Sequence, residues 1–289
     1  MNRKLITIYV VCTNHGQFIS DCLNSLANQK KKNFDLVIIN NGSTDNSNEI
    51  INKFKFKDVI LLEFKQTFTL HKIANLMIKK TNTDFIMRLD GDDILEKNAT
   101  KIFENYISKN KSSVAFFGNY YLINQYGKKL GKFVRHNFKK VKLLDQPAHG
   151  ACTLFNKNFL STIGGYESKF KAQDGFLIWL KLIESKKKFT HIKEPIFFYR
   201  QHPYNLTKNT NIINSSKFKI LKLILQKNLN KISSTCFIPL LDREINNKFF
   251  SQFKIESKKL IDLKIEELLK CKFIKKIIVS TDNELIKSY

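Results

Sequence analysis

Apolar and polar positions between residues 5 and 121 alternate between two patterns at short intervals. Continuous apolar runs such as Leu5–Val11 and Asp35–Ile39 predict buried β-strands, and apolar residues three or four apart in Phe18–Gln29 predict a helix. Strands and helices that alternate in this way are typical of parallel βαβ units. The same patterns predict strands at Val59–Phe64, Asp84–Leu89 and Val114–Tyr121, and helices at about Thr44–Lys55, Leu70–Lys80 and Ala99–Ser108.

The second half of the chain predicts fewer elements, and they fall into two groups. The first comprises a hairpin near Tyr126-Gly127, a helix at about Gly175–Glu184 and a strand at Ile196–Tyr199. After a lysine-rich helix at Ser216–Lys231 come a strand at Cys236–Leu241, a helix at Leu260–Leu269 and a strand at Ile277–Val279. We therefore expect an α/β domain over residues 1–210, a helical linker over 211–232 and a small, incomplete α/β segment over 233–289.

Composition places the chain among ordinary globular proteins. Hydrophobic residues make up 43% of its 289 residues and charged residues 26%. No apolar run approaches the roughly 20 residues that a membrane-spanning helix needs. The first apolar run contains Thr7 and Tyr9 and predicts a strand rather than a signal peptide, so a cytoplasmic location is expected. The cysteines are scattered without zinc-site spacing, which predicts reduced core residues.

The net charge of +25 changes the list of expected partners. Such an excess suits nucleic acid or an anionic membrane surface, although lysines spread over solvated faces produce it equally well. Arginine is preferred for bidentate phosphate recognition, and it is scarce among the 50 basic residues. We therefore expect no nucleic acid partner, and at most peripheral contact with the inner face of an anionic membrane.

Two turns at predicted strand ends carry candidate chemistry. Asp90 and Asp92 in Asp90-Gly91-Asp92-Asp93 alternate at a strand end and can converge on one point, which suits Mg²⁺ or Mn²⁺ bridging phosphates. In Asn40–Asp45, Gly42 permits a tight turn and the next helix turns its amides toward a ligand. The alternatives are an acidic turn that caps the following helix, and an ordinary strand–turn–helix connection with a capping side chain.

Together with four further motifs, these turns resemble the family 2 glycosyltransferases over residues 5–207. Asn40–Asp45 resembles the family's Asp-Asp-Gly-Ser-Thr-Asp turn, and Arg88–Asp93 resembles its Asp-x-Asp metal motif. The other matching motifs are Val10–His15, Ile163-Gly164-Gly165-Tyr166, Asp174-Gly175 followed by Trp179-Leu180-Lys181, and Tyr199-Arg200-Gln201-His202.

The resemblance implies a GT-A fold, which is a Rossmann-like, mixed but mostly parallel sheet flanked by helices. It also implies an inverting enzyme that uses a nucleotide-sugar donor and a glycan or lipid-linked acceptor. In that reading Asp92, assisted by Asp90, holds the metal on the donor diphosphate, and Asp174 is the general base. The other donor-binding candidates are Thr13, Asn40, Asn41, Arg200 and His202. The alternatives are a helix N-cap for Asp174, a structural role for His202 and a core position for Trp179.

Departures from the family pattern leave two rival functions open. Cys12 replaces the usual proline, the following aromatic residue is absent, and Asn40 stands where the family has an aspartate at the nucleobase. A catalytically impaired GT-A-like protein that binds nucleotide sugars is therefore one alternative. The other is part of a sugar nucleotidyltransferase, because Phe237-Ile238-Pro239 and Ile277–Asp282 resemble the start of acylneuraminate cytidylyltransferases. The intervening Leu240–Lys248 carries Arg243 but no glycine, so we expect no such activity.

Overall fold

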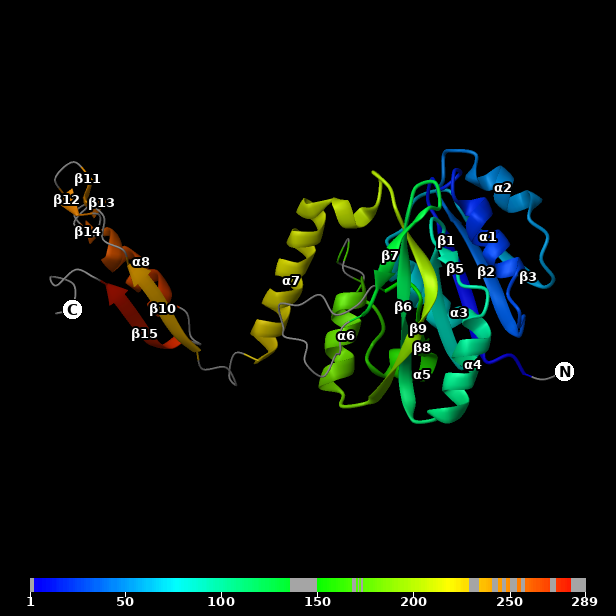
Figure 1. The fold of residues 1–289 in the computed structure, drawn as a ribbon. Coiled ribbons are helices and arrows are strands. Elements are labelled where there is room, and N and C mark those ends of the chain that lie inside the picture. The colour runs from blue at the N-terminus through cyan, green and yellow to red at the C-terminus, as the bar shows by residue number, and fades with distance from the viewer. Residues whose placement is uncertain are drawn as a thin grey trace. The chain divides into compact units, whose positions relative to one another are not determined.

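The computed structural model describes residues 3–135, 150–167, 170, 172, 174–228, 234–240, 244–245, 248–249, 254–255, 258–270 and 274–281. The chain forms two compact units, residues 1–217 and 218–289. The predicted division at 210 and 232 stays a prediction. Figure 1 gives the course of the chain within each unit.

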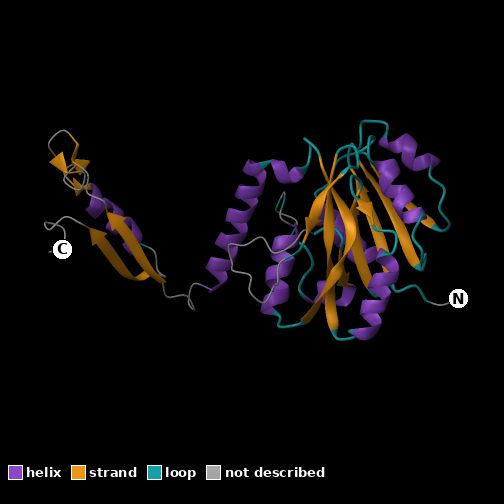
Figure 2. Cartoon of the chain, viewed as in Figure 1, coloured by secondary structure: helices purple, strands orange, loops and turns teal. Residues whose placement is uncertain are grey.

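The first unit is built on a nine-stranded mixed sheet in the order β3-β2-β1-β4-β8-β6-β9-β5, with β7 paired to β6. Figure 2 shows helices on both sides of this sheet. Strands β1 to β4 pair in parallel, as do β6 and β9, whereas β8 runs antiparallel between β4 and β6. The strands are β1 Ile6–Cys12, β2 Phe34–Asn41, β3 Val59–Phe64, β4 Phe85–Asp90, β5 Ile94–Leu95, β6 Ser113–Asn124, β7 Lys129–Phe133, β8 Thr153–Asn156 and β9 Lys188–Gln201.

Helices cover both faces of this sheet because its central strands are apolar on both sides. Ile8 and Val10 of β1 join one core with α1, α2 and α4, and Tyr9 and Val11 join the other core with α3, α5 and α6. The helices are α1 Ile19–Ala27, α2 Ser47–Lys53, α3 Leu70–Lys80, α4 Ala99–Lys109, α5 Lys157–Thr162 and α6 Asp174–Glu184; a 3₁₀ helix Leu206–Lys208 and α7 Thr210–Asn228 follow.

The cysteines of this unit lie in its core. Cys12, Cys22 and Cys152 are free thiols and buried, as their scattered positions predict. Burial raises the pKa of all three thiols, which keeps them protonated and chemically inert. The side chains of the remaining two, Cys236 and Cys271, lie outside the described residues.

Most elements predicted from the sequence are present within a few residues of their expected bounds. Helix α2 begins at Ser47 rather than near Thr44, because the Asp45 carboxylate accepts a hydrogen bond from the Ser47 amide and holds a turn before the helix. Strand β9 begins at Lys188, well before the predicted start at Ile196. The prediction missed its first half because lysine, threonine and histidine residues interrupt the apolar pattern there. The short elements β5, β8 and α5 were not predicted.

The second unit contains the expected βαβ arrangement. Strands β10 Ser234–Leu240 and β15 Ile274–Thr281 pair in parallel, and α8 Leu260–Leu269 lies between them in sequence. Two small hairpins, β11 Glu244–Ile245 with β12 Lys248–Phe249 and β13 Lys254–Ile255 with β14 Lys258–Lys259, complete it. Arg243 and Asp282, part of the cytidylyltransferase resemblance, lie outside the described residues.

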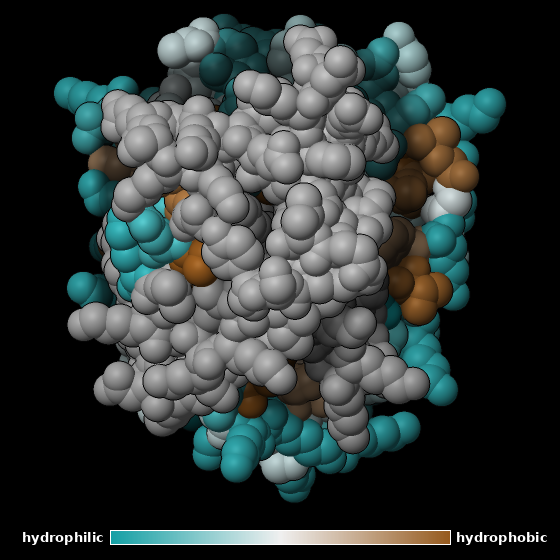
Figure 3. Space-filling view, turned by 90° about the vertical axis from the view of Figure 1, so that its left-hand side faces the viewer, coloured by the Kyte–Doolittle hydropathy of each residue, from teal (hydrophilic) through white to brown (hydrophobic). Residues whose placement is uncertain are grey.

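No helix among the residues that the structure describes is both long and apolar enough to cross a membrane. On the face shown in Figure 3, hydrophilic residues predominate where described residues reach the surface, and hydrophobic residues form separate groups.

Candidate active site

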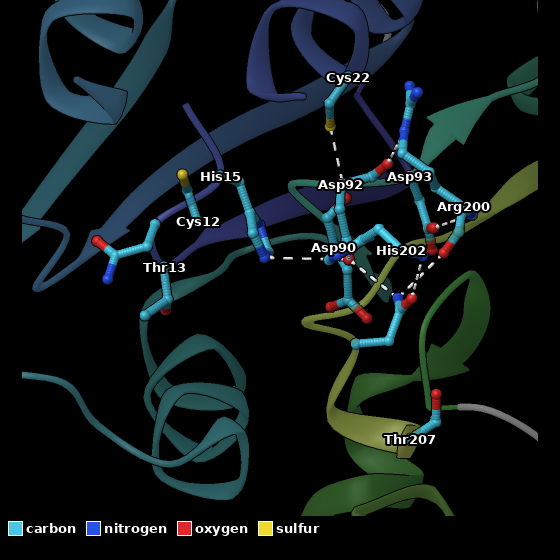
Figure 4. Close-up of polar contacts among 12 residues, drawn as sticks. Cys12, Thr13, His15, Cys22, Asp90, Asp92, Asp93, Arg200, His202 and Thr207 are labelled. Atoms are coloured by element: carbon cyan, nitrogen blue, oxygen red, sulfur yellow. Dashed lines mark hydrogen bonds and ion pairs between the residues drawn. The ribbon is translucent and has the colours of Figure 1, made fainter. Parts of the chain in front are cut away.

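A cleft of about 490 Å³ opens where β1, β2 and β4 end. The register pairs Cys12 with Asn40 and Val11 with Asp90, so these strand ends lie side by side. The volume falls in the range of small-molecule sites, and the carboxyl edge of parallel strands is where α/β sheets bind ligands. The residues that line it include Thr13, Asn41, residues 67–70, Asp90, Asp92, Tyr204, Leu206 and Thr207. Figure 4 shows Thr13 and Thr207 on either side of Asp90.

Asp90 lies on the cleft but is paired within the protein. The Arg88 guanidinium approaches it with Nε at 2.7 Å from Oδ1 and Nη2 at 3.4 Å from Oδ2. The Arg88 side chain is almost fully buried and also lines the cleft. A buried arginine two residues along the same strand therefore neutralises the Asp90 carboxylate.

Asp92 is the centre of a buried cluster with two histidines. The Nε2 atom of His202 lies 2.9 Å from Asp92 Oδ2, and that of His15 lies 3.9 Å from the same oxygen. Figure 4 shows both imidazole groups directed toward the carboxylate. Burial disfavours the charged form of Asp92, but the His202 hydrogen bond and the two imidazole groups outweigh it and hold its pKa below the usual value. Asp92 therefore stays ionised at neutral pH.

The residues fit a hard divalent cation held by two protein ligands. Asp92 Oδ2 and His202 Nε2 face each other across a hydrogen bond of 2.9 Å, so an ion held by both side chains would replace this bond. Such ions keep waters and substrate phosphates as their other ligands. The described residues contain no group of three or more His, Cys, Asp or Glu side chains arranged for a metal.

Arg200 is hydrogen-bonded to the acidic turn at Asp92 and Asp93 and is not one of the residues that line the cleft. Its side chain is 1% exposed and donates from Nε to the Asp92 carbonyl (2.8 Å) and from Nη1 to the Gln125 carbonyl (2.9 Å). Its Nη2 pairs with the Asp21 carboxylate of α1 at 2.8 Å, and its backbone amide donates to Asp93. Arg200 therefore ties the acidic turn, α1 and the β6–β7 turn together, which leaves its guanidinium no free face for a donor.

Of the residues predicted to contact the nucleoside, Thr13 and Asn41 line the cleft, whereas Asn40 is buried in the turn after β2. Asn40 is 4% exposed, and its side-chain oxygen accepts a hydrogen bond from the Ser43 amide, so it stabilises the turn after β2. Asn41 and Thr13 line the cleft, and the Asn41 side chain donates to the Thr13 hydroxyl at 2.9 Å. The structure therefore turns Asn41, rather than Asn40, toward the cleft.

Asp174 is the first residue of α6, and its side chain lies outside what the structure describes. The next two residues, Gly175 and Phe176, line the cleft, so the start of α6 belongs to its wall. Trp179 is fully buried against Phe117 and Phe155, as a core position predicts.

Several residues of the site were not among the predicted site residues, although His15 ends the matching motif Val10–His15. His15 and Asn205 approach Asp92. The Asn205 side-chain oxygen also accepts a hydrogen bond from the His202 backbone amide. Tyr204, 85% exposed, also lines the cleft. Isolated histidine, asparagine and tyrosine residues are common in loops, and only the fold brings these three to one place.

A model of the family described as "Glycosyl transferase family 2" matches residues 7–164. The chain is 28% identical to the glycosyltransferase GlyG of Streptococcus pneumoniae serotype 4 over 120 residues, which cover 41% of this chain and 40% of that protein. It is 26% identical to the poly-β-1,6-N-acetyl-D-glucosamine synthase of Staphylococcus aureus (strain COL) over 185 residues, 60% of this chain and 45% of that protein. The chain thus spans less than half the length of these two relatives.

Among solved structures the chain resembles S. aureus TarS residues 1–349 in complex with UDP-GlcNAc. The TM-score is 0.65 at 18% identity, covering 78% of this chain and 67% of that chain. TarS 1–349 in complex with UDP gives a TM-score of 0.58, also at 18% identity, over 78% of this chain and 72% of that one. This likeness confirms the predicted fold class, a mixed α/β sheet flanked by helices.

Proposed function

Since the chain belongs to glycosyl transferase family 2, we propose that it is a glycosyltransferase that moves a sugar from a nucleoside-diphosphate sugar to an acceptor hydroxyl. The observation that carries this proposal is the cleft at the carboxyl edge of the sheet. It combines an ionised, histidine-flanked Asp92, a polar end at Thr13 and Asn41, and the start of α6 in one space of suitable size.

Asp92 and His202 hold Mg²⁺ or Mn²⁺ in this proposal, and Asp90 assists from its pair with Arg88. The chemistry that such an ion would supply is neutralisation of the negative charge on the diphosphate leaving group. The protein side of this site is rigid, because Arg200 binds the Asp92 carbonyl and Asn205 binds both the Arg200 carbonyl and the His202 amide. A carboxylate fixed in this way would hold the ion in position without reorganisation at the moment of reaction.

Asp174 is the general base in this proposal. It removes the proton from the acceptor hydroxyl, whose oxygen attacks the anomeric carbon from the side opposite the diphosphate, so the configuration inverts. This role is supported by Gly175 and Phe176, the two residues after Asp174, which line the cleft.

Donor and acceptor classes follow the relatives in this proposal. TarS was solved with UDP-GlcNAc and with UDP, which supports a uridine diphosphate sugar as the first donor to test. The S. aureus synthase is named for a polysaccharide, which supports a glycan or a lipid-linked glycan as acceptor. The excess of lysine supports a cytoplasmic protein with peripheral contact at the anionic inner membrane face.

The test is a panel of UDP-, GDP- and dTDP-sugars incubated with the chain and Mn²⁺, with release of the nucleoside diphosphate as the readout. We expect one donor class to turn over and EDTA to abolish turnover. Asp174→Asn should lower transfer about 10²–10⁴-fold while donor affinity stays within about twofold. Failure of every donor to bind or turn over would refute the proposal, and binding without turnover would favour the catalytically impaired alternative.

A further inference from the structure

One wall of the cleft, residues 67–70, is fixed to the end of β2 by a single side chain. The Asn41 side-chain oxygen accepts a hydrogen bond from the Phe68 amide at 2.8 Å, and its nitrogen donates to the Phe68 carbonyl at 3.1 Å. This two-point pairing also fixes which end of the amide group is oxygen, because a backbone N–H needs an acceptor and a carbonyl needs a donor. Asn41 is 2% exposed, so water does not compete for these bonds.

The remaining proton of the Asn41 side-chain amide makes the Thr13 hydroxyl an acceptor toward Asn41. The Asn41 nitrogen donates it to the Thr13 hydroxyl oxygen at 2.9 Å. Because an amide nitrogen donates hydrogen bonds and does not accept them, the Thr13 hydroxyl is the acceptor in this pair and directs its own proton elsewhere. Thr13 lines the cleft, so this proton is available to a bound ligand.

Gly42, the residue after Asn41, packs directly against the backbone that leads into the same wall. Gly42 has a φ of +69°, and a Cβ atom there would lie 2.7 Å from the Gln66 carbonyl carbon and 2.7 Å from the Thr67 amide nitrogen. The backbone that leads into the wall therefore packs directly on Gly42. Asn41 and Gly42 together hold residues 66–68 against the end of β2.

We propose that Asn41 is a positioning residue of the nucleoside end of the cleft. It acts through Thr13, whose hydroxyl it presents as a donor, and through Phe68, whose loop it holds in place. Toward a ligand Asn41 itself retains only the second lone pair of its oxygen. The inference rests on the proposed function, because it assumes that a nucleoside diphosphate occupies the cleft with its diphosphate at Asp92.

The experiment measures, by calorimetry on the full chain with Mn²⁺, the affinity for inorganic pyrophosphate and for whichever of UDP, GDP and dTDP binds wild type most tightly. Pyrophosphate reports the Asp92 end alone, whereas the nucleoside diphosphate reports both ends. The variants are Asn41→Ala, Thr13→Val, their double variant and the conservative Thr13→Ser. Thr207→Val is the matched control, because Figure 4 shows Thr207 on the far side of Asp90 from Thr13, and its hydroxyl lies 2.9 Å from the Tyr199 hydroxyl.

We expect Asn41→Ala and Thr13→Val each to weaken nucleoside diphosphate binding about tenfold and to leave pyrophosphate binding within about twofold. Asn41→Ala should cost at least about threefold less when Thr13 is already valine, because part of its effect passes through the Thr13 hydroxyl. Thr13→Ser should retain most of the affinity. Thr207→Val should leave the ratio of the two affinities unchanged.

Gly42→Ala keeps the inference testable if Asn41→Ala fails to fold. It displaces the wall without removing any polar group and should likewise lower nucleoside diphosphate affinity while sparing pyrophosphate. The positioning role would be overturned if the double variant lost affinity for the nucleoside diphosphate by the product of the two single losses. A parallel loss of pyrophosphate binding would overturn it as well. Failure of the proposed function looks different, since no nucleoside diphosphate would then bind the wild-type chain.

Discussion

At the scale of single residues, Asp93 carries a carboxyl group into a fully buried position. Its Oδ1 atom accepts a hydrogen bond from the Arg200 amide at 2.9 Å, and Oδ2 has no hydrogen-bond partner among the described residues. Burial, reinforced by the nearby charges of Asp92 and Asp90, raises the pKa of Asp93 well above its usual value. The folded state therefore favours the protonated carboxyl group.

This shift predicts a pH dependence of stability with a definite sign. Because the pKa of Asp93 is higher in the folded than in the unfolded state, the unfolded chain loses this proton first as the pH rises above about 4. Unfolding is then favoured, so Asp93 destabilises the fold increasingly from that pH up to its folded pKa. Asp93→Asn removes this dependence.

Urea unfolding from pH 5 to 8 in EDTA provides the measurement. The stability of wild type relative to Asp93→Asn should fall as the pH rises. A constant or growing advantage of wild type over that range would show that Asp93 is ionised in the fold.

The residue scale is also where the sequence predicts least. Alternation at a strand end correctly predicts that Asp90 and Asp92 reach the same cleft. It does not separate them, because their difference comes from Arg88 on one side and His202 on the other. Likewise, the Asn40-Asn41 pair predicts a polar strand end, but which amide faces the cleft depends on how Ser43 and Phe68 pack.

At the scale of elements, the Gly164-Gly165 turn connects α5 to the segment that leads into α6. Both glycines have positive φ, +78° and +64°. A Cβ on Gly165 would lie 2.5 Å from the Asn75 side-chain oxygen, whereas a Cβ on Gly164 would meet no atom within 4 Å. The Asn75 oxygen accepts from the Tyr166 amide (2.8 Å) and its nitrogen donates to the Tyr166 carbonyl (2.7 Å), so this turn is fastened to α3.

The two glycines therefore give a matched pair of variants. Gly164→Ala should destabilise the fold by about 1–2 kcal/mol, the cost of a left-handed conformation for an L-residue. Gly165→Ala should cost roughly 1–2 kcal/mol more, because it also displaces Asn75 and breaks the two bonds to Tyr166. Thermal unfolding with donor turnover measures both effects. Equal losses at the two positions would mean that the Asn75 contact contributes nothing.

Elements with strong patterns are predicted well, and short ones are not. The predicted bounds of Leu70–Lys80 and Val59–Phe64 match the structure at both ends. The first has a clear helical periodicity, and the second is a mostly apolar run bounded by polar residues. Strand β8 has only four residues, and its place between β4 and β6 depends on antiparallel pairing with both neighbours. No local pattern encodes such a partner, so the mixed character of the sheet at this point becomes visible only in the structure.

At the scale of the whole molecule, the layered sheet gathers loops from distant parts of the chain at one edge. The lining residues described for the cleft run from Val11 to Ile213, all within the first unit. The family match at residues 7–164 lies inside the same unit. A chain that ends after α7, at Asn228, should therefore bind nucleoside diphosphate within about twofold of the full chain.

Calorimetry on the shortened chain checks this independence. A loss of binding with an intact melting transition would show that residues after 228 contribute to the site. The cytidylyltransferase resemblance of the second unit stays a prediction, and we expect the full chain to show no turnover of CTP.

The central claim is that Asp92 and His202 hold a divalent ion against the donor diphosphate. Its most direct test is an anomalous difference map from crystals of the chain grown with Mn²⁺ and UDP. The account predicts one manganese peak in bonding distance of the Asp92 carboxylate, the His202 imidazole and the UDP phosphates. Manganese or diphosphate bound away from Asp92 would contradict it.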